Sequence, residues 1–257
     1  MSDDVLRFET DGSVATLTLN RPKQFNALDA DLRRALRETT QRVEDDPAIR
    51  VAIIKGEGRG FCAGADLSAG LEKPVSEHIE REYKPSLETI ADGNTIWIAQ
   101  VHGVAAGIGA AYAMNCDLVT MADDATVYMA FAAIALIPDG GNTQLLLSHM
   151  GYHRALQAIL EGRKIPADEC LQYGIANKVF TPEELNASTL EWAKSIADGA
   201  PLSMGAAKRL LRKVGRLNYG AAISAEGLEQ NTLTESEDFT TGVNAFFTKE
   251  KPNFQGK

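Results

Sequence analysis

The sequence predicts an α/β fold in which a strand-containing core is followed by a helical region. Three observations support this prediction. Strand and helix patterns alternate over the first two thirds of the 257 residues, glycine clusters follow two of the apolar strands, and only helical patterns occur from about Ala167 onward. With 44% hydrophobic and 24% charged residues, the composition is that of a globular protein able to bury a sizeable core.

The elements are predicted from turn signals, caps and periodicity. Asp11-Gly12 marks a hairpin between two strands, and Asp29 caps an amphipathic helix that Pro47 closes. Later strands are apolar runs, and later helices show the helical period. The predicted strands are Val5–Phe8, 14–19, 51–54, 97–101 and 118–121. One predicted helix begins at Asp29 and another begins after Gly141. The other predicted helices cover 75–92, 110–114, 167–173, 182–199, 203–216, 219–231 and 236–248. The simplest organisation is a core over residues 1–200 and a C-terminal helical region over residues 201–257.

Charge and cysteine content exclude several classes of protein. The net charge of −9 argues against a general binder of nucleic acids or anionic membranes. Three scattered cysteines make no disulfide framework, the acidic N-terminus has no targeting signature, and the longest apolar stretch, 127–138, is too short to span a bilayer. We expect a cytoplasmic protein with neither a membrane nor a nucleic-acid partner.

Two glycine-containing loops are the candidate functional features. Gly60–Asp66 and Gly103–Gly109 each lie at a predicted junction between a buried strand and a helix. Glycine lets backbone approach a ligand closely, and a helix N-terminus offers unpaired N–H groups with a partial positive charge. Two such N–H groups form an oxyanion hole if they converge on one oxygen. Tight turns and close packing are the structural alternative.

Other motifs give no site. The chain has no nucleophile elbow or Walker A sequence, and Gly107-x-Gly109 lacks the third glycine of a dinucleotide fingerprint. His149 and His153 have a metal-like spacing, but Gly151 interrupts their helix and no carboxylate completes a set, so we expect no metal. Cys62 has no histidine nearby in sequence and is interpreted as a small packed residue.

Motifs along nearly the whole chain resemble the crotonase, or enoyl-CoA hydratase/isomerase, superfamily. They occur in the family's order: Leu19-Asn20-Arg21-Pro22 with Asn26-Ala27-Leu28, Gly60–Leu67, Val101-His102-Gly103 through Asn115-Cys116-Asp117, Ile137-Pro138-Asp139-Gly140-Gly141, and Ala245–Lys249. The resemblance implies a spiral core of ββα turns with a trimerising C-terminal helical region, assembled as a homotrimer or a dimer of trimers. It also implies a coenzyme A thioester as substrate, with no separate cofactor.

The resemblance assigns roles to individual residues. The backbone N–H groups of Ala65 and Ile108 would form the oxyanion hole, although the family usually has glycine at the second position. The residues implied to line the acyl-CoA site are Ala27, Ala63, Gly64, Asp66, Leu67, Gly107 and Gly109. From the C-terminal region, Phe246 and Lys249 would reach the nucleotide end, in their own or a neighbouring subunit, with a solvated Lys249 as the alternative.

The acid/base residue decides the reaction. Family hydratases use two glutamates, whose positions here hold Ala111 and Phe131, so ordinary hydration of a 2-enoyl-CoA is disfavoured. Asp139 is the nearest remaining carboxylate, in the turn where several family isomerases carry theirs. Those are members similar to epoxyphenylacetyl-CoA isomerase and to the peroxisomal Δ3,Δ2-enoyl-CoA isomerases. Asp139 follows the apolar run 127–138, which predicts a dry pocket and a raised pKa. Alternatively, Asp139 caps the next helix.

The leading hypothesis is an acyl-CoA double-bond isomerase with Asp139 as acid/base and Tyr128 and Phe131 as pocket walls. A second hypothesis is a hydratase, hydrolase or lyase that draws its acid from Glu77, Glu80 or Glu82, which otherwise form a solvated helix face. A third is a non-catalytic acyl-CoA-binding scaffold. Basic residues at helical spacing form a stripe that comprises Lys208, Arg209, Arg212, Lys213 and Arg216. Such a stripe could indicate nucleic-acid binding, but we interpret it as a solvated or inter-subunit face.

Overall fold

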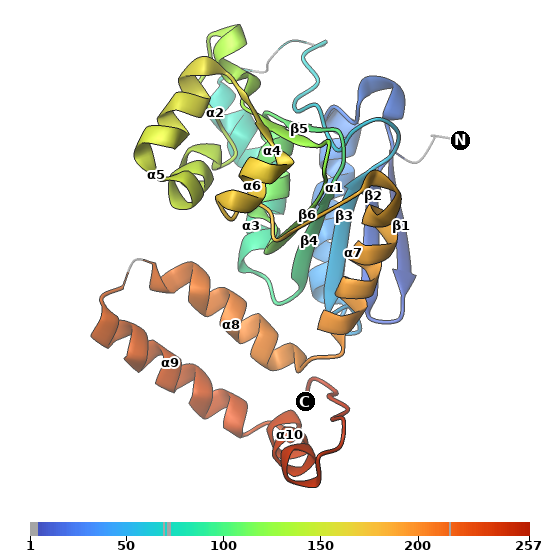
Figure 1. The fold of residues 1–257 in the computed structure, drawn as a ribbon, viewed down its shortest axis with the longest axis vertical. Coiled ribbons are helices and arrows are strands. Elements are labelled where there is room, and N and C mark those ends of the chain that lie inside the picture. Colours follow the sequence, from blue (N-terminus) through green and yellow to red (C-terminus); the bar gives the residue numbers. More distant parts are fainter. Residues whose placement is uncertain (1–4, 69, 71–72, 216) are drawn as a thin grey trace.

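A six-stranded sheet forms the centre of the computed structural model, which describes residues 5–68, 70, 73–215 and 217–257 (Figure 1). The strand order is β1-β2-β3-β4-β6-β9. β1 and β2 form the predicted antiparallel hairpin, and all later neighbours pair in parallel. The strands are β1 (Leu6–Asp11), β2 (Val14–Leu19), β3 (Val51–Gly56), β4 (Ile96–Val101), β6 (Leu118–Ala122) and β9 (Lys178–Phe180).

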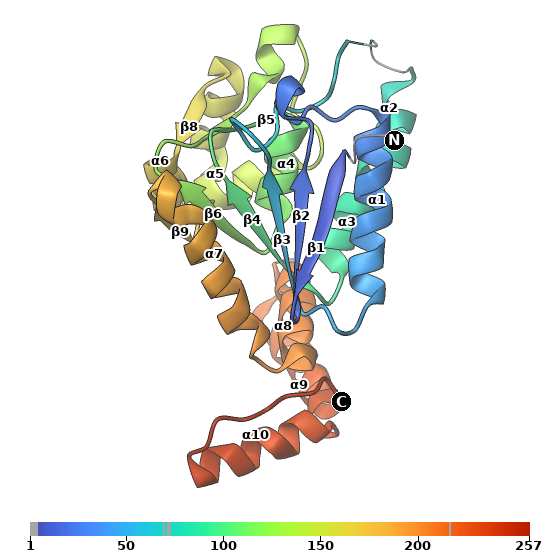
Figure 2. The same cartoon turned by 90° about the vertical axis from the view of Figure 1, so that its right-hand side faces the viewer.

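Helices cover both faces of this sheet, as Figure 2 shows from the side. One face carries α1 (Ala30–Asp45), α3 (Lys84–Asp92) and α4 (Ile108–Asn115), and the other carries α7 (Pro182–Ala197). Side chains alternate between the faces, so that Ala52 and Ile54 of β3 pack in the larger core while Val51 and Ile53 pack toward α7. A sheet buried on both faces explains why its strands are continuous apolar runs.

A second sheet of three short strands lies beside the first and frames the candidate site. Its order is β5-β7-β8, formed by Val104–Ala106, Thr126–Tyr128 and Lys164–Pro166. α6 (Ala167–Gln172) packs against this sheet and α5 (Asn142–Glu161) against α4. α2 (Val75–His78) leads into a π-helical segment (Ile79–Tyr83) that packs against α1 and α3, and 3-10 turns occupy Pro22–Gln24 and Ala130–Ile134.

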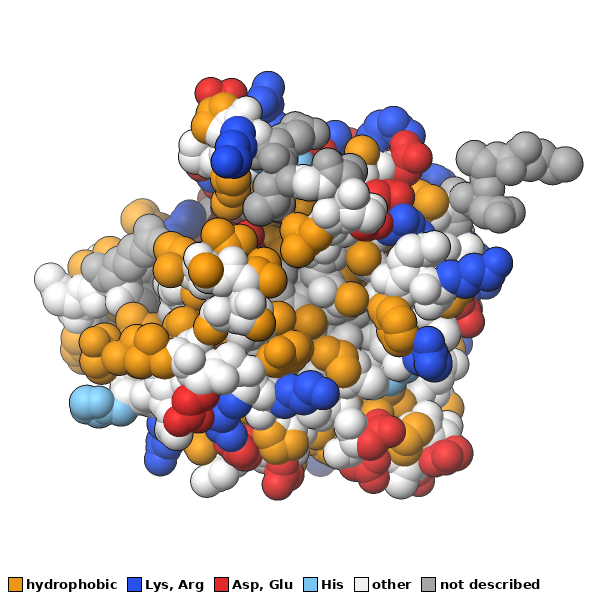
Figure 3. Space-filling view, turned by 90° about the horizontal axis from the view of Figure 1, so that it is seen from above, with side chains coloured by type: hydrophobic (Ala, Val, Ile, Leu, Met, Phe, Trp, Pro, Cys, Tyr) orange, Lys and Arg blue, Asp and Glu red, His pale blue; other side chains and the backbone are white. Residues whose placement is uncertain are grey.

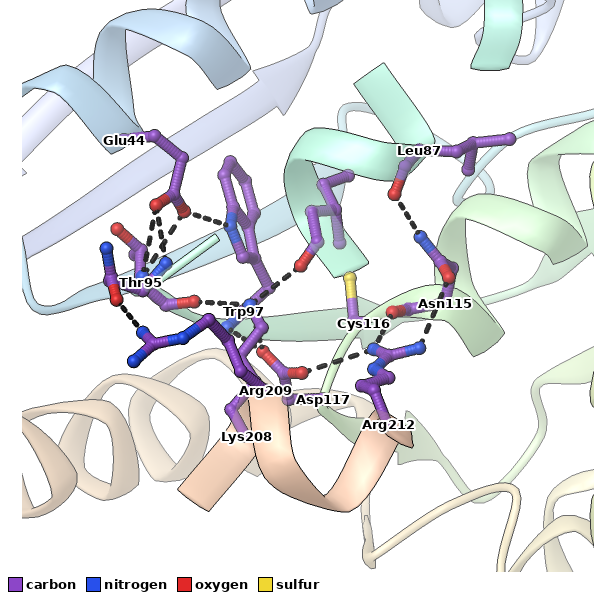
Figure 4. A network of polar contacts seen from close by, with 12 residues as sticks. Glu44, Leu87, Thr95, Trp97, Asn115, Cys116, Asp117, Lys208, Arg209 and Arg212 are labelled. Atoms are coloured by element: carbon purple, nitrogen blue, oxygen red, sulfur yellow. Dashed lines mark hydrogen bonds and ion pairs between the residues drawn. The ribbon is translucent and has the colours of Figure 1, made fainter. Parts of the chain in front are cut away.

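The last three helices extend away from the sheet (Figures 1 and 2). They are α8 (Pro201–Val214), α9 (Tyr219–Thr234) and α10 (Glu237–Thr248). A polar network fixes α8 to the core (Figure 4). In this network Lys208 Nζ lies 2.9 Å from Asp117 Oδ2 and donates to the carbonyl oxygens of Ile90 and Thr95, while Arg212 pairs with Asp117 at 3.2 Å.

This network corrects the interpretation of the basic stripe. Lys208 is buried, Arg209 bonds to Asn94, and Arg212 is half-buried against Asp117, so these three side chains form an intramolecular anchor. Lys213 is exposed, as expected for a solvated face, and Arg216 lies outside the described residues.

Most predicted elements are confirmed, with shifted ends. Asp29 accepts a hydrogen bond from the N–H of Leu32 and caps α1, and Gly12 has the positive φ of a hairpin turn. The predicted polar helix over 75–92 is wrong in character, because a π-helical segment divides it and it buries His78, Tyr83, Ser86, Leu87 and Ile90. No helix in the described part of the chain is long and apolar enough to cross a bilayer.

Candidate active site

The two glycine-containing loops meet beside β5. Cys62 donates its N–H to the carbonyl of Val104, and Ala106 donates back to the carbonyl of Cys62. At Gly64, where φ is +98°, a Cβ would lie only 2.9 Å from the carbonyl oxygen of Ala106. A Cβ on Gly107, where φ is +54°, would lie 3.9 Å from the Cα of Gly64. Glycine at position 64 is therefore required by both the backbone conformation and the close approach of the second loop.

The N–H group of Ala65 is available to a ligand. Ala65 and Leu28 form an isolated parallel bridge in which Leu28 donates to Gly64 and Asp66 donates to Leu28. This pattern uses the residues on either side of Ala65, and no described residue accepts the Ala65 N–H. The expectation that this loop leads directly into a helix is wrong, because the next helix begins at Val75. A strand-like bridge, rather than a helix terminus, orients this donor.

Ile108 supplies the second candidate donor as the first residue of α4. First-turn N–H groups of a helix have no intrahelical partner, and none of the described groups accepts the N–H of Ile108. The preceding Gly107 is held by the carbonyl of Tyr128, which accepts its N–H at 3.1 Å, and by Asn142 Nδ2, which donates to its carbonyl at 3.0 Å.

The structure shows how a residue larger than glycine fits at position 108. The buried Ile108 side chain points at Gly140, where a Cβ would lie 2.2 Å from Ile108 Cδ1 and 2.8 Å from the Cβ of Ala111. Gly140 also has a positive φ of 60°. The missing side chain at Gly140 therefore accommodates Ile108 and brings the turn containing Asp139 against the start of α4.

Asp139 is half-buried, and its Oδ1 atom is buried without a hydrogen-bond partner among the described residues. Burial raises the pKa of Asp139 to about 6, although a hydrogen bond from its own backbone opposes the shift. The proposed helix-cap alternative is wrong, because Gly141 is the N-cap of α5 and no side chain caps that helix. An unpartnered carboxyl group with a raised pKa is suited to proton transfer.

The apolar run before Asp139 does not form the expected dry wall. Phe131 and Pro138 are buried, but Ala132 through Ile137 are exposed, and Ile137 is 79% exposed. Figure 3, which views this end from above, shows hydrophobic side chains gathered over its middle. The preceding run lies on the surface and therefore does not bury Asp139. The turn at Gly140 packs on α4, and this packing places Asp139 in the interior.

The predicted pocket walls lie at Gly107. Phe131 Cζ would be 3.8 Å from a Cβ on that glycine, so the phenyl ring adjoins the second loop. Tyr128 supports Gly107 through its backbone, and its ring lies 5.8 Å from the Lys164 ammonium group. Gly109 packs on Cys62, because a Cβ there would lie 2.7 Å from its Cβ and Sγ atoms.

The predicted coenzyme-binding residues form one contiguous rim. Ala63 donates its N–H to Phe25, and Arg21 links the Ala27 carbonyl to the Asp66 carboxylate. Hydrogen bonds with Ser68 hold the pKa of Asp66 below its usual value against the opposing effect of burial, and Arg21 adds to the lowering. Ala63 and Leu67 are exposed beside them. Within one chain, Phe246 and Lys249 are not brought to this rim: they lie on and just after α10, at the opposite end of the molecule (Figures 1 and 2).

A cavity of about 280 Å³ adjoins Ala65, and no sequence motif predicted it. It lies between α1, α2 and the π-helical segment, and is lined by Arg21, Asp29, Ala30, Arg33, Ala65, Asp66, Ser68, Gly70, His78 and Tyr83. Tyr83 is 3% exposed, and burial raises its pKa to about 12, with the charge of Asp139 adding to the shift and Arg33 opposing it.

The remaining candidates have structural roles or none. Cys62 is fully packed, its thiol contacts the Asn26 carbonyl, and burial raises its pKa to about 12. Gly151 breaks α5 between His149 and His153 as predicted, and the described residues contain no cluster that could hold a metal ion. Glu77 and Glu80 are exposed in i,i+4 pairs, whereas Glu82 is partly buried between Arg33 and Arg37.

Comparison with known proteins tests the family suggested by these loops. The model of the enoyl-CoA hydratase/isomerase family matches residues 9–257. The chain belongs to this family. It is 34% identical to the 1,2-epoxyphenylacetyl-CoA isomerase of Escherichia coli over 250 residues, 95% of each protein, and 32% identical to a probable enoyl-CoA hydratase of Rhodobacter capsulatus over the whole of both. The crystal structure of an enoyl-CoA hydratase from Bacillus anthracis superposes with a TM-score of 0.93 at 27% identity, covering 98% of this chain and 100% of that one.

As an enoyl-CoA hydratase/isomerase family member, the chain has a crotonase fold and is an acyl-CoA enzyme. Its relatives carry isomerase and hydratase names alike, so family membership leaves the reaction open. In this chain, Ala111 is fully buried and Phe131 is nearly so. The two positions at which we expected the glutamates of a hydratase are thus apolar and enclosed.

Proposed function

We propose that this enzyme is an acyl-CoA double-bond isomerase that works through a thioester enolate, with Asp139 as its single acid/base. The observation that carries this proposal is the buried, unpartnered Oδ1 of Asp139 on a turn packed against Ile108. The apolar residues at positions 111 and 131 support it further, because they offer no second carboxylate to activate water. The similarity to an isomerase of epoxyphenylacetyl-CoA agrees with this assignment.

In the proposed reaction, the N–H groups of Ala65 and Ile108 donate to the thioester oxygen of a 3-enoyl-CoA. The Asp139 carboxylate removes a proton from C2, and the electron pair delocalises over the thioester as a dienolate. The two N–H groups stabilise the negative oxygen, an effect that is typically worth 10² to 10³ in rate per donor. Protonated Asp139, whose proton exchanges with solvent, then delivers a proton to C4, which yields the conjugated 2-enoyl-CoA. No water is consumed and no cofactor is needed beyond the coenzyme A of the substrate.

For substrate binding, we propose that the rim of Ala27, Ala63, Gly64, Asp66 and Leu67 holds the coenzyme. Gly107, Gly109, Tyr128 and Phe131 would shape the region around the reacting carbons C2 to C4. Phe246 and Lys249 are too far from this rim within one chain, so we assign them to the site of a neighbouring subunit in a homotrimer or a dimer of trimers. An ammonium group suits the phosphates of coenzyme A as a point charge.

Proton exchange tests the proposal directly. We would incubate wild type and Asp139→Asn with a 3-enoyl-CoA in deuterated water and follow double-bond position and deuterium content by NMR. We expect the wild type to isomerise the substrate with deuterium incorporation, and the variant to lose at least about 100-fold in rate, as for removal of a general acid/base.

Other outcomes would contradict the isomerase assignment. Equal activity of the two proteins would exclude Asp139 as the acid/base. Loss of the conjugated thioester absorbance through addition of water to a 2-enoyl-CoA would indicate a hydratase. Binding of acyl-CoAs without any exchange would indicate a non-catalytic scaffold.

A further inference from the structure

The cavity beside Ala65 is unusually polar for a site that would receive the acyl part of a fatty acyl thioester. Its lining includes the charged side chains of Arg21, Asp29, Arg33 and Asp66 together with the Tyr83 phenol. Acyl chains that end in methyl gain nothing from such groups and would leave them without water. The charged lining therefore favours an acyl group that itself ends in a polar or charged group.

The charges separate into two groups at the cavity wall. Arg21 pairs with both Asp29, at 3.0 Å, and Asp66, at 3.1 Å, so this group contains two acids and one base. On the other side, Glu82 is shared by two bases, with Arg37 at 2.7 Å and Arg33 at 3.4 Å. Burial alone would raise the pKa of Glu82, but hydrogen bonds and charge from Arg37 and Arg33 outweigh it and lower that pKa. The second group thus has one positive charge in excess.

Arg33 places this excess positive charge at the cavity wall. Its side chain is only 10% exposed, and Nη1 donates to the Leu28 carbonyl at 3.1 Å. Among the described residues its one carboxylate partner is Glu82, through the longer of the two contacts, and Arg37 does not line the cavity. A buried guanidinium group with incomplete charge compensation is a strong site for an anionic oxygen.

Tyr83 lies beside Arg33 and provides a neutral donor. The guanidinium carbon is 5.7 Å from the centre of the Tyr83 ring, and the His78 ring packs edge-on against the same ring at 5.4 Å. Tyr83 ends the π-helical segment Ile79–Tyr83, a distortion that is frequent at functional sites. Its phenol stays protonated at neutral pH and can donate a hydrogen bond.

We propose that this cavity selects acyl groups whose far end carries a carboxylate, which Arg33 and the Tyr83 hydroxyl bind. This inference rests on the proposed function, because the Ala65 N–H must hold the thioester oxygen for the acyl group to extend into the cavity. The substrates are then coenzyme A thioesters of unsaturated dicarboxylic acids, with the second carboxylate free.

Binding of unreactive thioesters tests this inference independently of catalysis. We would titrate the wild-type protein calorimetrically with adipyl-CoA and with hexanoyl-CoA, which share a six-carbon chain and differ at its end. We expect adipyl-CoA to bind at least about tenfold more tightly, as for one charge-assisted hydrogen bond. Equal or weaker binding of adipyl-CoA would overturn the proposal.

Three variants locate the effect. Arg33→Met and Tyr83→Phe should each reduce the preference for adipyl-CoA while leaving the affinity for hexanoyl-CoA within about threefold. Arg34→Met is the matched control, since Arg34 lies on the same helix as Arg33 but pairs with the exposed Asp31 and does not line the cavity. A preference that survives both Arg33→Met and Tyr83→Phe, or that Arg34→Met removes equally, would overturn the assignment.

The conservative Tyr83→Phe variant keeps the proposal testable even if Arg33→Met does not fold. Tyr83→Phe keeps the ring and its contacts with Arg33 and His78, and removes only the hydroxyl group.

The proposed function and this inference can also fail separately. Absence of proton exchange with every 3-enoyl-CoA would contradict the isomerase assignment, whereas exchange without a preference for carboxylate-ended substrates would contradict only the cavity assignment.

Discussion

Asp139 combines two properties that act on activity and stability in opposite directions. Burial raises the pKa of its carboxyl group to about 6, so the ionised form is disfavoured in the folded protein. The same desolvation makes the carboxylate a stronger base toward carbon acids. At the residue scale, the pH dependence of the enzyme follows from this one group.

We expect kcat/KM for isomerisation of a 3-enoyl-CoA to rise with pH through about 6 and then level off. The reason is that Asp139 must be ionised to remove the C2 proton, and its pKa is about 6 in the folded protein. Initial rates across pH 4.5 to 8.5 measure this profile. A profile that rises near 4, where an unperturbed aspartate titrates, would show that Asp139 is solvated or is not the base.

Stability should show the opposite dependence, and it can be measured without substrate. Because the folded pKa lies above the unfolded value, the folded state binds more protons between about pH 4 and 6, and the free energy of unfolding falls as pH rises through that interval. Asp139→Asn lacks this loss, so we expect the variant to be more stable than wild type at pH 8 and the difference to shrink below pH 4. Urea unfolding at both pH values serves as the control that the variant folds.

At the scale of secondary-structure elements, α8 depends on a buried cation. The Lys208 ammonium group is 3% exposed and is satisfied by Asp117 and two backbone carbonyls (Figure 4). Removing one partner of a buried pair leaves the other charge poorly compensated. Here Arg212 still pairs with Asp117, which limits the loss.

We expect Lys208→Met to lower the free energy of unfolding by about 3 kcal/mol, at the lower end of the range for buried ion pairs. Lys213→Met, on the exposed side of the same helix, should change it by less than about 0.5 kcal/mol. Urea unfolding of the three proteins measures both values. Equal stability of Lys208→Met and Lys213→Met would show that the network does not hold α8 to the core.

Element prediction succeeded where patterns were long and failed where they were short. The apolar run at 97–101, which lies in β4, and the capped, amphipathic α1 are visible in sequence, and both were confirmed. The three-residue strands β5, β7, β8 and β9 were missed, because so short a segment shows no periodicity and forms only against a partner strand. The π-helical segment was missed because its sequence fits an ordinary helix.

At the scale of the whole molecule, a single chain exposes a large apolar surface on its last helices. The residues are Leu211, Tyr219, Ile223, Leu228, Phe239, Phe246 and Phe247, and Leu228, Phe246 and Phe247 are at least 70% exposed. Soluble monomers rarely leave such a surface open, so we expect it to be an association site. This agrees with the proposed trimer, in which α10 reaches a neighbouring active site.

We expect the protein to have a mass of three or six times 27.7 kDa in sedimentation analysis. Leu228→Glu places a charge in the exposed apolar surface of α9 and should shift the distribution toward the monomer, with loss of isomerase activity. Ala187→Glu, on the exposed side of α7, should leave both unchanged. A wild-type protein that sediments as a monomer at micromolar concentration would contradict the assembly and the role of Phe246 and Lys249 across subunits.

The sequence by itself determined the family, five of the six strands of the main sheet and the two glycine-containing loops, because these depend on local signals: turn residues, caps, apolar periodicity and motif order. The tertiary structure alone decided how the site is arranged. Ile108 fits because Gly140 lacks a side chain, Asp139 is drawn inward by that same turn, and Arg33 and Tyr83 line one cavity although 50 residues separate them. Such contacts join distant segments through packing and charge, and no local pattern records them.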